Sequence, residues 1–233
     1  MWSYIIVAVA AYLLGSIPTG YLVAKAKGID IRKTGSGNIG ATNAMRVLGK
    51  LAGIFVLLAD AAKGFGAIYL GAFIYSKLCE WRAPSDSIVL FTVEEIERVA
   101  IIAGIFAVLG HNYTCWLKFK GGKGIATTAG VFLALAPCAL AIALGVFILF
   151  VALTKYMSVG SIAAAIALPA AVWVLPPHDL FLGIVTTALG ALAIWKHKSN
   201  IQRLMAGTEN RLGKKLAHEN ARPNNQKESE DMK

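Results

Sequence analysis

Residues 125–154 read IATTAGVFLALAPCALAIALGVFILFVALT, a run of 30 residues that contains no charged side chain. An ordinary membrane-spanning helix needs about 20 apolar residues, so this run is too long for one span. Pro137 lies near its middle, and proline breaks a helix because it lacks the backbone N–H and clashes with the preceding turn. The run therefore forms either one over-long span or two short spans that separate at Pro137.

Five further apolar runs are typical of a membrane protein. They cover residues 4–24, 51–76, 99–117, 156–175 and 180–195. Of the 233 residues, 57% are hydrophobic and 15% are charged, whereas charged residues make up about a quarter of a soluble domain. No basic segment precedes the first run, which is also too long for the core of a signal peptide. We therefore expect this run to be a retained transmembrane helix.

The charges between the apolar runs decide how often the chain crosses the membrane. Segment 25–50 holds six basic residues and one acidic residue, segment 118–123 holds three lysines, and segment 77–98 is rich in acidic residues. The positive-inside rule places the two basic segments in the cytoplasm and the acidic one outside. The rule also favours a cytoplasmic position for the basic segment that begins at Lys196. This position is reached only if residues 125–154 form two spans. The sequence thus predicts an all-α fold: a polytopic membrane helical bundle with seven transmembrane helices, the N-terminus outside and the C-terminus cytoplasmic.

Domain organisation and partners follow from the same composition. Residues 1–216 are expected to form a single integral-membrane domain, and the polar residues 217–233 a disordered cytoplasmic tail. The net charge of +10 lies between apolar runs instead of along one soluble face, so we expect a membrane surface or an anionic substrate and no nucleic acid. Cys79, Cys115 and Cys138 form no CxxC pair and no even set for a disulfide framework. We expect them to pack as small apolar side chains.

The first basic segment contains GSGNIGATN at residues 35–43, followed by Arg46. This stretch matches the dinucleotide-binding pattern GxGxxG. Asp60 also lies about 20 residues after the last glycine, where that pattern has an acidic residue. The match is misleading, because no strand precedes it and Asp60 falls inside an apolar run. Small residues, exposed backbone N–H groups and a nearby guanidinium suit a phosphate-binding nest instead. A flexible Gly/Ser turn is the alternative.

A second glycine-rich loop, KGGKGIATT at residues 120–128, passes directly into the long apolar run. Glycines before a helix N-terminus let backbone N–H groups and the helix dipole face an anion, and Lys123 adds a point charge. The loop is not a Walker A motif, because Gly124 follows the lysine where Ser or Thr should hold magnesium. It is therefore either a phosphate site or a basic loop that contacts anionic lipid headgroups.

Two more polar clusters lie at the cytoplasmic ends of predicted helices. They consist of Tyr156, Ser158, Ser161, His197, Asn200 and Arg203. A spacing of about three residues places each cluster on one helix face. A lone serine in a membrane helix more often bonds to its own backbone, so each residue by itself is a weak sign. Four polar clusters at the same cytoplasmic level together indicate a site.

Three polar residues lie apart from these clusters. Asp60 and Lys63 stand at positions i and i+3 within the second apolar run. Charge inside a membrane is costly, so such a pair marks either function or a structural ion bridge, and we favour the bridge. His111 is either a catalytic group or a boundary residue bonded to a carbonyl.

At these residues the chain resembles the acyl-phosphate:glycerol-3-phosphate acyltransferase family of bacterial membranes, over nearly its whole length. The motifs that carry the resemblance are residues 14–18, 35–43 with Arg46, Asp60 with Lys63 and Gly64, 110–111, 119–124, Ser158 with Ser161, 197–207, and Glu209. The resemblance implies seven spans and transfer of an acyl group from acyl phosphate to glycerol 3-phosphate. The products would be lysophosphatidic acid (1-acyl-glycerol 3-phosphate) and phosphate, in the first acylation step of phospholipid synthesis. It implies no metal and no diffusible cofactor.

The resemblance also implies which residues form the site. The catalytic candidates are Ser36, Arg46, Lys123, His197 and Asn200. The candidates for binding substrate and phosphate are Gly35, Gly37, Asn38, Thr42, Asn43, Gly121, Gly122, Gly124, Ser158 and Ser161. The site would face the cytoplasm from a multi-pass protein of the bacterial inner membrane, with acyl phosphate, glycerol 3-phosphate and membrane lipids as partners. Segment 77–98 looks longer than is usual in the family, and the tail extends beyond Glu209. The oligomeric state stays open.

Other classes of protein share some of these features. A secondary transporter for a phosphorylated metabolite also uses basic loops, broken helices and midplane charges, but it binds its substrate near the bilayer centre. Here most polar clusters gather at the cytoplasmic ends. A non-catalytic lipid-binding scaffold would not need two glycine-rich nests. None of the four histidines is followed five residues later by aspartate, which excludes the His-x4-Asp acyltransferases that use acyl-CoA or acyl carrier protein.

Overall fold

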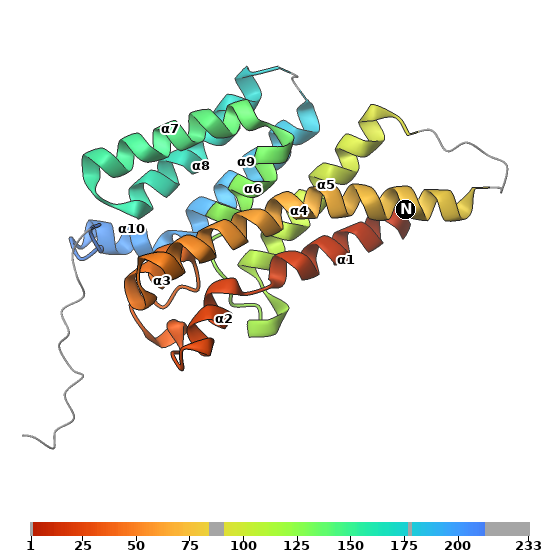
Figure 1. The fold of residues 1–233 in the computed structure, drawn as a ribbon. Helices are drawn as coiled ribbons and strands as arrows, with labels where there is room; N and C mark the ends of the chain where they lie inside the picture. Colours follow the sequence, from red (N-terminus) through yellow and green to blue (C-terminus); the bar gives the residue numbers. More distant parts are fainter. Residues whose placement is uncertain (1, 84–90, 177–178, 213–233) are drawn as a thin grey trace, which may run out of the picture.

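The computed structural model describes residues 2–83, 91–176 and 179–212. Every regular element in these ranges is helical, which confirms the all-α class (Figure 1). The α-helices are α1 (Trp2–Ser16), α2 (Thr19–Ala26), α3 (Ala41–Leu48), α4 (Lys50–Arg82), α5 (Val93–Asn112), α6 (Ile125–Leu135), α7 (Pro137–Thr154), α8 (Met157–Val174), α9 (Leu180–Lys196) and α10 (Lys198–Met205). Two 3-10 helices, η1 (Ile31–Lys33) and η2 (Cys115–Leu117), lie in the connecting loops. The tail predicted at 217–233 lies outside the described residues, as does part of segment 77–98.

Within the described residues, four helical stretches are long and apolar enough to cross a membrane. They are Trp2–Ala26, which joins α1 and α2, and the single helices α4, α7 and α8. A fifth is present if α9 and α10, which meet at an angle of 51°, count as one bent span. The 11 residues of α6 are too few for an ordinary span. A membrane helical bundle is thus established, whereas the count of seven spans and their orientation stay predictions.

Prolines interrupt two of the apolar runs. The break expected at Pro137 is confirmed, because α6 ends at Leu135 and α7 begins at Pro137, where the missing N–H costs no intrahelical hydrogen bond. The first apolar run is also interrupted, at Pro18, so that α1 ends at Ser16 and α2 begins at Thr19. The expected continuous helix over residues 4–24 is therefore two helices, for the same covalent reason.

Small residues let the helices approach one another closely. A Cβ added to Gly130 of α6 would lie 1.8 Å from the carbonyl oxygen of Ala61 in α4, and one on Gly64 of α4 would lie 2.2 Å from that of Thr127 in α6. Such contacts are typical of packed membrane helices. Figure 1 shows α1, α4 and α5 side by side, with α7 and α8 forming a pair. The contact between α4 and α6 fixes the loop that precedes α6.

The outer surface of the bundle is apolar along its longest helices. Leu153 on α7 is 72% exposed, and Leu58 and Phe73 on α4 are 62% and 60% exposed. A soluble domain rarely leaves large apolar patches open to water. These side chains therefore suit a surface that faces lipid.

Asp60 and Lys63 form the buried ion pair that the sequence favours. Lys63 Nζ lies 2.8 Å from Asp60 Oδ1, and the two side chains are 6% and 3% exposed. Lys63 Nζ also donates to the carbonyl oxygen of Ile17, at 2.8 Å. Ile17 adjoins the Pro18 break, where carbonyls at the end of α1 lack intrahelical partners. The ion pair thus joins α4 to the junction of α1 and α2.

Candidate active site

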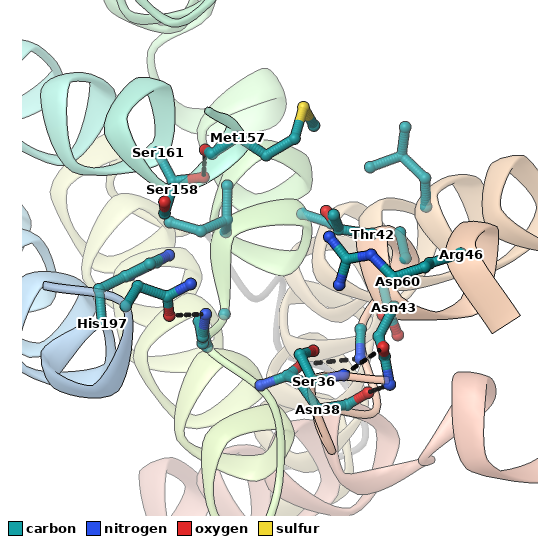
Figure 2. Close-up of a pocket in the computed structure, with 18 of the residues that line it drawn as sticks. Ser36, Asn38, Thr42, Asn43, Arg46, Asp60, Met157, Ser158, Ser161 and His197 are labelled. Carbon is teal, nitrogen blue, oxygen red and sulfur yellow. Dashed lines mark hydrogen bonds between the residues drawn. The ribbon is translucent and has the colours of Figure 1, made fainter. Parts of the chain in front are cut away.

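Loops and helix ends enclose a cavity of about 150 Å³ (Figure 2). All five catalytic candidates line it, together with six of the residues predicted to bind substrate. These eleven are Ser36, Asn38, Thr42, Asn43, Arg46, Lys123, Gly124, Ser158, Ser161, His197 and Asn200. The predicted glycines at 35, 37, 121 and 122 are not among the lining residues. Segments that are distant in the sequence therefore meet in one cavity, as the resemblance implies.

The four glycines outside the wall shape the loops behind it. The two in the first loop have φ values of +64° and +70°, which glycine adopts without steric cost. In the second loop, the Gly121 N–H donates to the carbonyl oxygen of Asn112 at 3.2 Å, and the Gly122 N–H donates to that of His111 at 3.0 Å. These two N–H groups hold the loop against the end of α5 and are not free for phosphate.

Asn43 organises the first loop from inside. Its side-chain Nδ2 donates to the carbonyl oxygens of Thr34 at 3.0 Å and Asn38 at 2.8 Å and lies 3.3 Å from that of Ile31, and its Oδ1 accepts from the Ser36 N–H at 2.9 Å. The residue is only 2% exposed. Because its polar atoms are already engaged, Asn43 holds Ser36 and Asn38 in place at the cavity wall.

Two helices begin at the cavity. Gly40, Ala41 and Thr42 at the start of α3 line it, as do the first residues of α6 after Gly124. The first N–H groups of a helix have no intrahelical partner, and the helix dipole makes that end positive. The cavity therefore offers two separate helix ends that favour anions.

A basic side chain accompanies each of the two helices that begin at the cavity. Arg46 comes from α3, and Lys123 precedes α6 and donates to Asn200 Oδ1 in α10. Burial lowers the pKa of Lys123 to about 8, with attraction to Glu209 opposing the shift and repulsion from Arg203 and Arg46 adding to it. Burial also lowers the pKa of Arg46, although an arginine stays charged. Asp60 also lines the cavity but is paired with Lys63. Three cations thus surround a single further carboxylate, and the cavity favours anionic ligands.

That carboxylate is Glu209, which the predicted site omits. Its Oε1 accepts from Asn200 Nδ2 and its Oε2 from Arg203 Nε, both at 2.7 Å. Burial acts to raise the pKa of Glu209, but these hydrogen bonds and the charge of Arg203 outweigh burial and lower the pKa. Glu209 is the sole acidic residue between positions 196 and 216. That isolation within a basic segment is the sequence signal that could have identified it.

The two serines of α8 behave differently. Ser158 Oγ donates to Glu209 Oε1 at 3.1 Å and so joins α8 to the segment after α10. Ser161 Oγ donates to the carbonyl oxygen of Met157 at 2.9 Å, within its own helix. Ser161 thus shows the back-bonding that is common for serines in membrane helices.

His197 lies at the junction of α9 and α10 and is 2% exposed. Its Nδ1 lies 2.8 Å from the carbonyl oxygen of Ala193. Since a carbonyl only accepts, Nδ1 carries the proton and Nε2 is left as an acceptor. Burial and, secondly, the charge of Lys123 lower the pKa of His197 to about 4. The imidazole is therefore neutral near pH 7.

Figure 2 shows Ser158, Ser161 and His197 on one side of the cavity and Thr42 and Arg46 on the other. Within the described ranges, no group of three or more His, Cys, Asp and Glu side chains is placed to hold a metal ion. An apolar membrane bundle with a cationic cavity between two helix N-termini defines a class of protein: an integral membrane protein with a cavity suited to anionic ligands.

Comparison with known proteins gives the family within this class. The family model described as glycerol-3-phosphate acyltransferase matches residues 5–207, and the chain belongs to this family. The chain is 46% identical to the glycerol-3-phosphate acyltransferase of Thermosynechococcus vestitus over 89% of its own length and 94% of that protein. It is 44% identical to that of Geobacter sulfurreducens, over 91% and 99% of the two chains.

Solved structures agree with this assignment. The chain is similar to PlsY (YgiH), an integral membrane glycerol 3-phosphate acyltransferase, in its glycerol 3-phosphate form, with a TM-score of 0.76 and 36% identity. The match covers 91% of this chain and 96% of that one. The lysophosphatidic acid form of the same protein matches with a TM-score of 0.73.

Proposed function

We propose that this glycerol-3-phosphate acyltransferase takes its acyl group from acyl phosphate, and that it releases lysophosphatidic acid and phosphate. The observation that carries the proposal is the pairing of two helix N-termini with two cations in one cavity. Each substrate of this reaction bears a phosphate, and helix N-termini bind phosphate well. Arg46 with α3 would hold one phosphate, and Lys123 with α6 the other. This reaction is the first acylation step of phospholipid synthesis.

The chemistry requires no activated nucleophile on the enzyme. Acyl phosphate is a mixed anhydride with a good leaving group, so the glycerol hydroxyl can attack the acyl carbon directly. The new C–O ester bond forms, the bond between the acyl carbon and the phosphate oxygen breaks, and phosphate leaves with the electron pair. Holding the two reactants together contributes up to ~7–11 kcal/mol to lowering the barrier. Lys123 and Arg46 would neutralise the charge on the phosphates, and Ser36 and Asn200 would orient the glycerol hydroxyls.

The proton of the glycerol hydroxyl must go to a base. His197 offers Nε2, but its pKa of about 4 makes it a weak base. A phosphate monoester has a second pKa of about 6 and is a stronger base. We therefore assign the proton to a phosphate oxygen of the substrate and give His197 the role of orienting it.

The acyl chain needs an apolar path out of the cavity. Leu57 of α4, Phe147 of α7 and Met157 of α8 line the cavity beside the polar groups. Leu57 is also 44% exposed on the outer surface. A chain that leaves between α4 and α7 would therefore enter lipid directly, without exposing apolar carbon to water.

The topology belongs to the same proposal. Seven spans would result if α5, α6 and α9 cross the membrane together with the four longer stretches. The basic segments would then put the cavity at the cytoplasmic face of the bacterial inner membrane, with segment 77–98 outside.

The test uses purified protein with acyl phosphate and labelled glycerol 3-phosphate, and acyl-CoA as the alternative donor. We expect labelled lysophosphatidic acid and inorganic phosphate in equal amounts with acyl phosphate, and no product with acyl-CoA. Transfer from acyl-CoA alone would contradict the proposed donor.

A further inference from the structure

His111 lies behind the loop that carries Lys123 and, with Asp60, also lines the inner end of the cavity. The transfer step described above does not use it. Its carbonyl oxygen accepts from the Gly122 N–H at 3.0 Å. A Cβ added to Gly122 would lie 2.1 Å from His111 Nε2. Gly122 is thus packed against the imidazole, and Lys123 is the next residue in the chain. A shift of the imidazole ring would therefore displace the backbone next to Lys123.

The imidazole is oriented from its other nitrogen. His111 Nδ1 lies 3.7 Å from Asp60 Oδ1, and the side chains are 5% and 3% exposed. This distance exceeds a direct hydrogen bond, so the attraction is electrostatic. In the part of the chain that the structure describes, Nδ1 has no hydrogen-bond partner. Asp60 is itself fixed by Lys63 at 2.8 Å, which reaches the carbonyl oxygen of Ile17.

We propose that His111, held by the Asp60–Lys63 ion pair, is a positioning residue for Lys123. The contacts run without interruption from Lys63 through Asp60, His111 and Gly122 to Lys123. A displacement of about 1 Å in a group that orients a substrate can lower the rate by roughly 10²-fold. The inference rests on the proposed function, because it takes Lys123 as a group that holds a substrate phosphate.

His111→Leu tests this proposal, since it removes both ring nitrogens without enlarging the side chain against Gly122. It leaves the Asp60–Lys63 pair intact, so that no buried charge loses its partner. We expect kcat/KM for the substrate whose phosphate Lys123 holds to fall by roughly 10²-fold. His111→Asn keeps a polar nitrogen near the position of Nδ1 and should recover part of the loss. Tyr12→Phe is the matched control: it removes a partly buried hydrogen bond to the Tyr113 carbonyl oxygen at the same end of α5 and should keep parental activity.

A double-mutant cycle separates positioning from a general loss of structure. If His111 acts through Lys123, then Lys123→Ala should cost far less in the His111→Leu background than in the parent enzyme. If the two residues act independently, the fold-losses in kcat/KM of the two single variants multiply in the double variant. That result would overturn the proposal. Parental kcat/KM in a folded His111→Leu enzyme would overturn it too. If His111→Leu does not insert or fold, the same double-mutant cycle is measured with His111→Asn and Lys123→Ala. A parent enzyme that transfers no acyl group from acyl phosphate contradicts the proposed function instead, so the two failures are distinguishable.

Discussion

The protonation of Lys123 should set the alkaline limit of the reaction. Burial lowers the pKa of Lys123 to about 8 in the free enzyme, against about 10.4 for an unperturbed lysine. The pH dependence of kcat/KM reports the ionisation of the free enzyme and free substrates. Glycerol 3-phosphate, a phosphate monoester, has a second pKa near 6, and the electron-withdrawing acyl group makes acyl phosphate more acidic still. Both substrates are therefore fully ionised above pH 8. A decline above pH 8 can therefore be assigned to the enzyme.

The magnitude follows from the protonated fraction of the lysine. With a pKa of about 8, roughly 90% of the free enzyme carries the charge at pH 7 and roughly 10% at pH 9. Because only the cation attracts phosphate, kcat/KM for the substrate whose phosphate Lys123 holds should fall about tenfold for each pH unit above 8. Removing the cation altogether with Lys123→Ala should lower activity by roughly 10²–10³-fold at pH 7.

The assay follows labelled lysophosphatidic acid from purified enzyme between pH 6 and 10, after subtraction of spontaneous donor hydrolysis. Lys123→Arg keeps its charge throughout this range, so its kcat/KM should show no decline near pH 8 even if its absolute value is lower. Lys120→Ala serves as the matched control, because this exposed lysine in the same loop does not line the cavity. A parental enzyme with a flat profile to pH 10, or a Lys123→Ala enzyme with near-normal activity, would refute the reasoning.

Three further predictions concern the remaining site residues and the topology. His197→Ala should raise KM for glycerol 3-phosphate and leave the acidic limb of the pH profile in place, whereas a loss of roughly 10²–10⁴-fold in kcat with unchanged KM would make His197 the base. Glu209→Gln removes the charge that binds Arg203, and hydrogen bonds to charged groups contribute about 1.5–3 kcal/mol. It should lower the melting temperature and weaken substrate binding, and an unaltered variant would count against a structural role for Glu209. In a cysteine-free background, a membrane-impermeant thiol reagent added from outside should label Glu94→Cys and not Lys198→Cys, and labelling of Lys198→Cys would contradict a cytoplasmic site.

Features that depend on covalent structure and local spacing could be predicted from the sequence. Proline in a helix interior lacks the N–H for an intrahelical hydrogen bond, so the break between α6 and α7 was foreseeable from Pro137. Pro169, in contrast, lies inside α8 without ending it. The polar clusters were also foreseeable as one site, because charge bias placed them at one level of the membrane. All five catalytic candidates do line the same cavity.

Features that depend on contacts between distant segments could not be predicted in this way. Asn43 has an amide side chain of the kind that binds ligands, yet this amide is engaged by carbonyl oxygens of its own loop. The isolation of Glu209 in a basic segment marks the residue as unusual, but only the fold shows that its partners are Ser158 and Arg203. The contact of Gly122 with His111 likewise exists only once α5 and the second loop are packed together.

The most direct test of the account is a competition between donors in one reaction. Purified enzyme receives glycerol 3-phosphate with equal concentrations of an acyl phosphate and an acyl-CoA whose chains differ in isotopic mass, and mass spectrometry reads the chain in the product. We predict that lysophosphatidic acid carries only the chain supplied as acyl phosphate, with one inorganic phosphate released per product. Lysophosphatidic acid that carries the chain supplied as acyl-CoA would contradict the account.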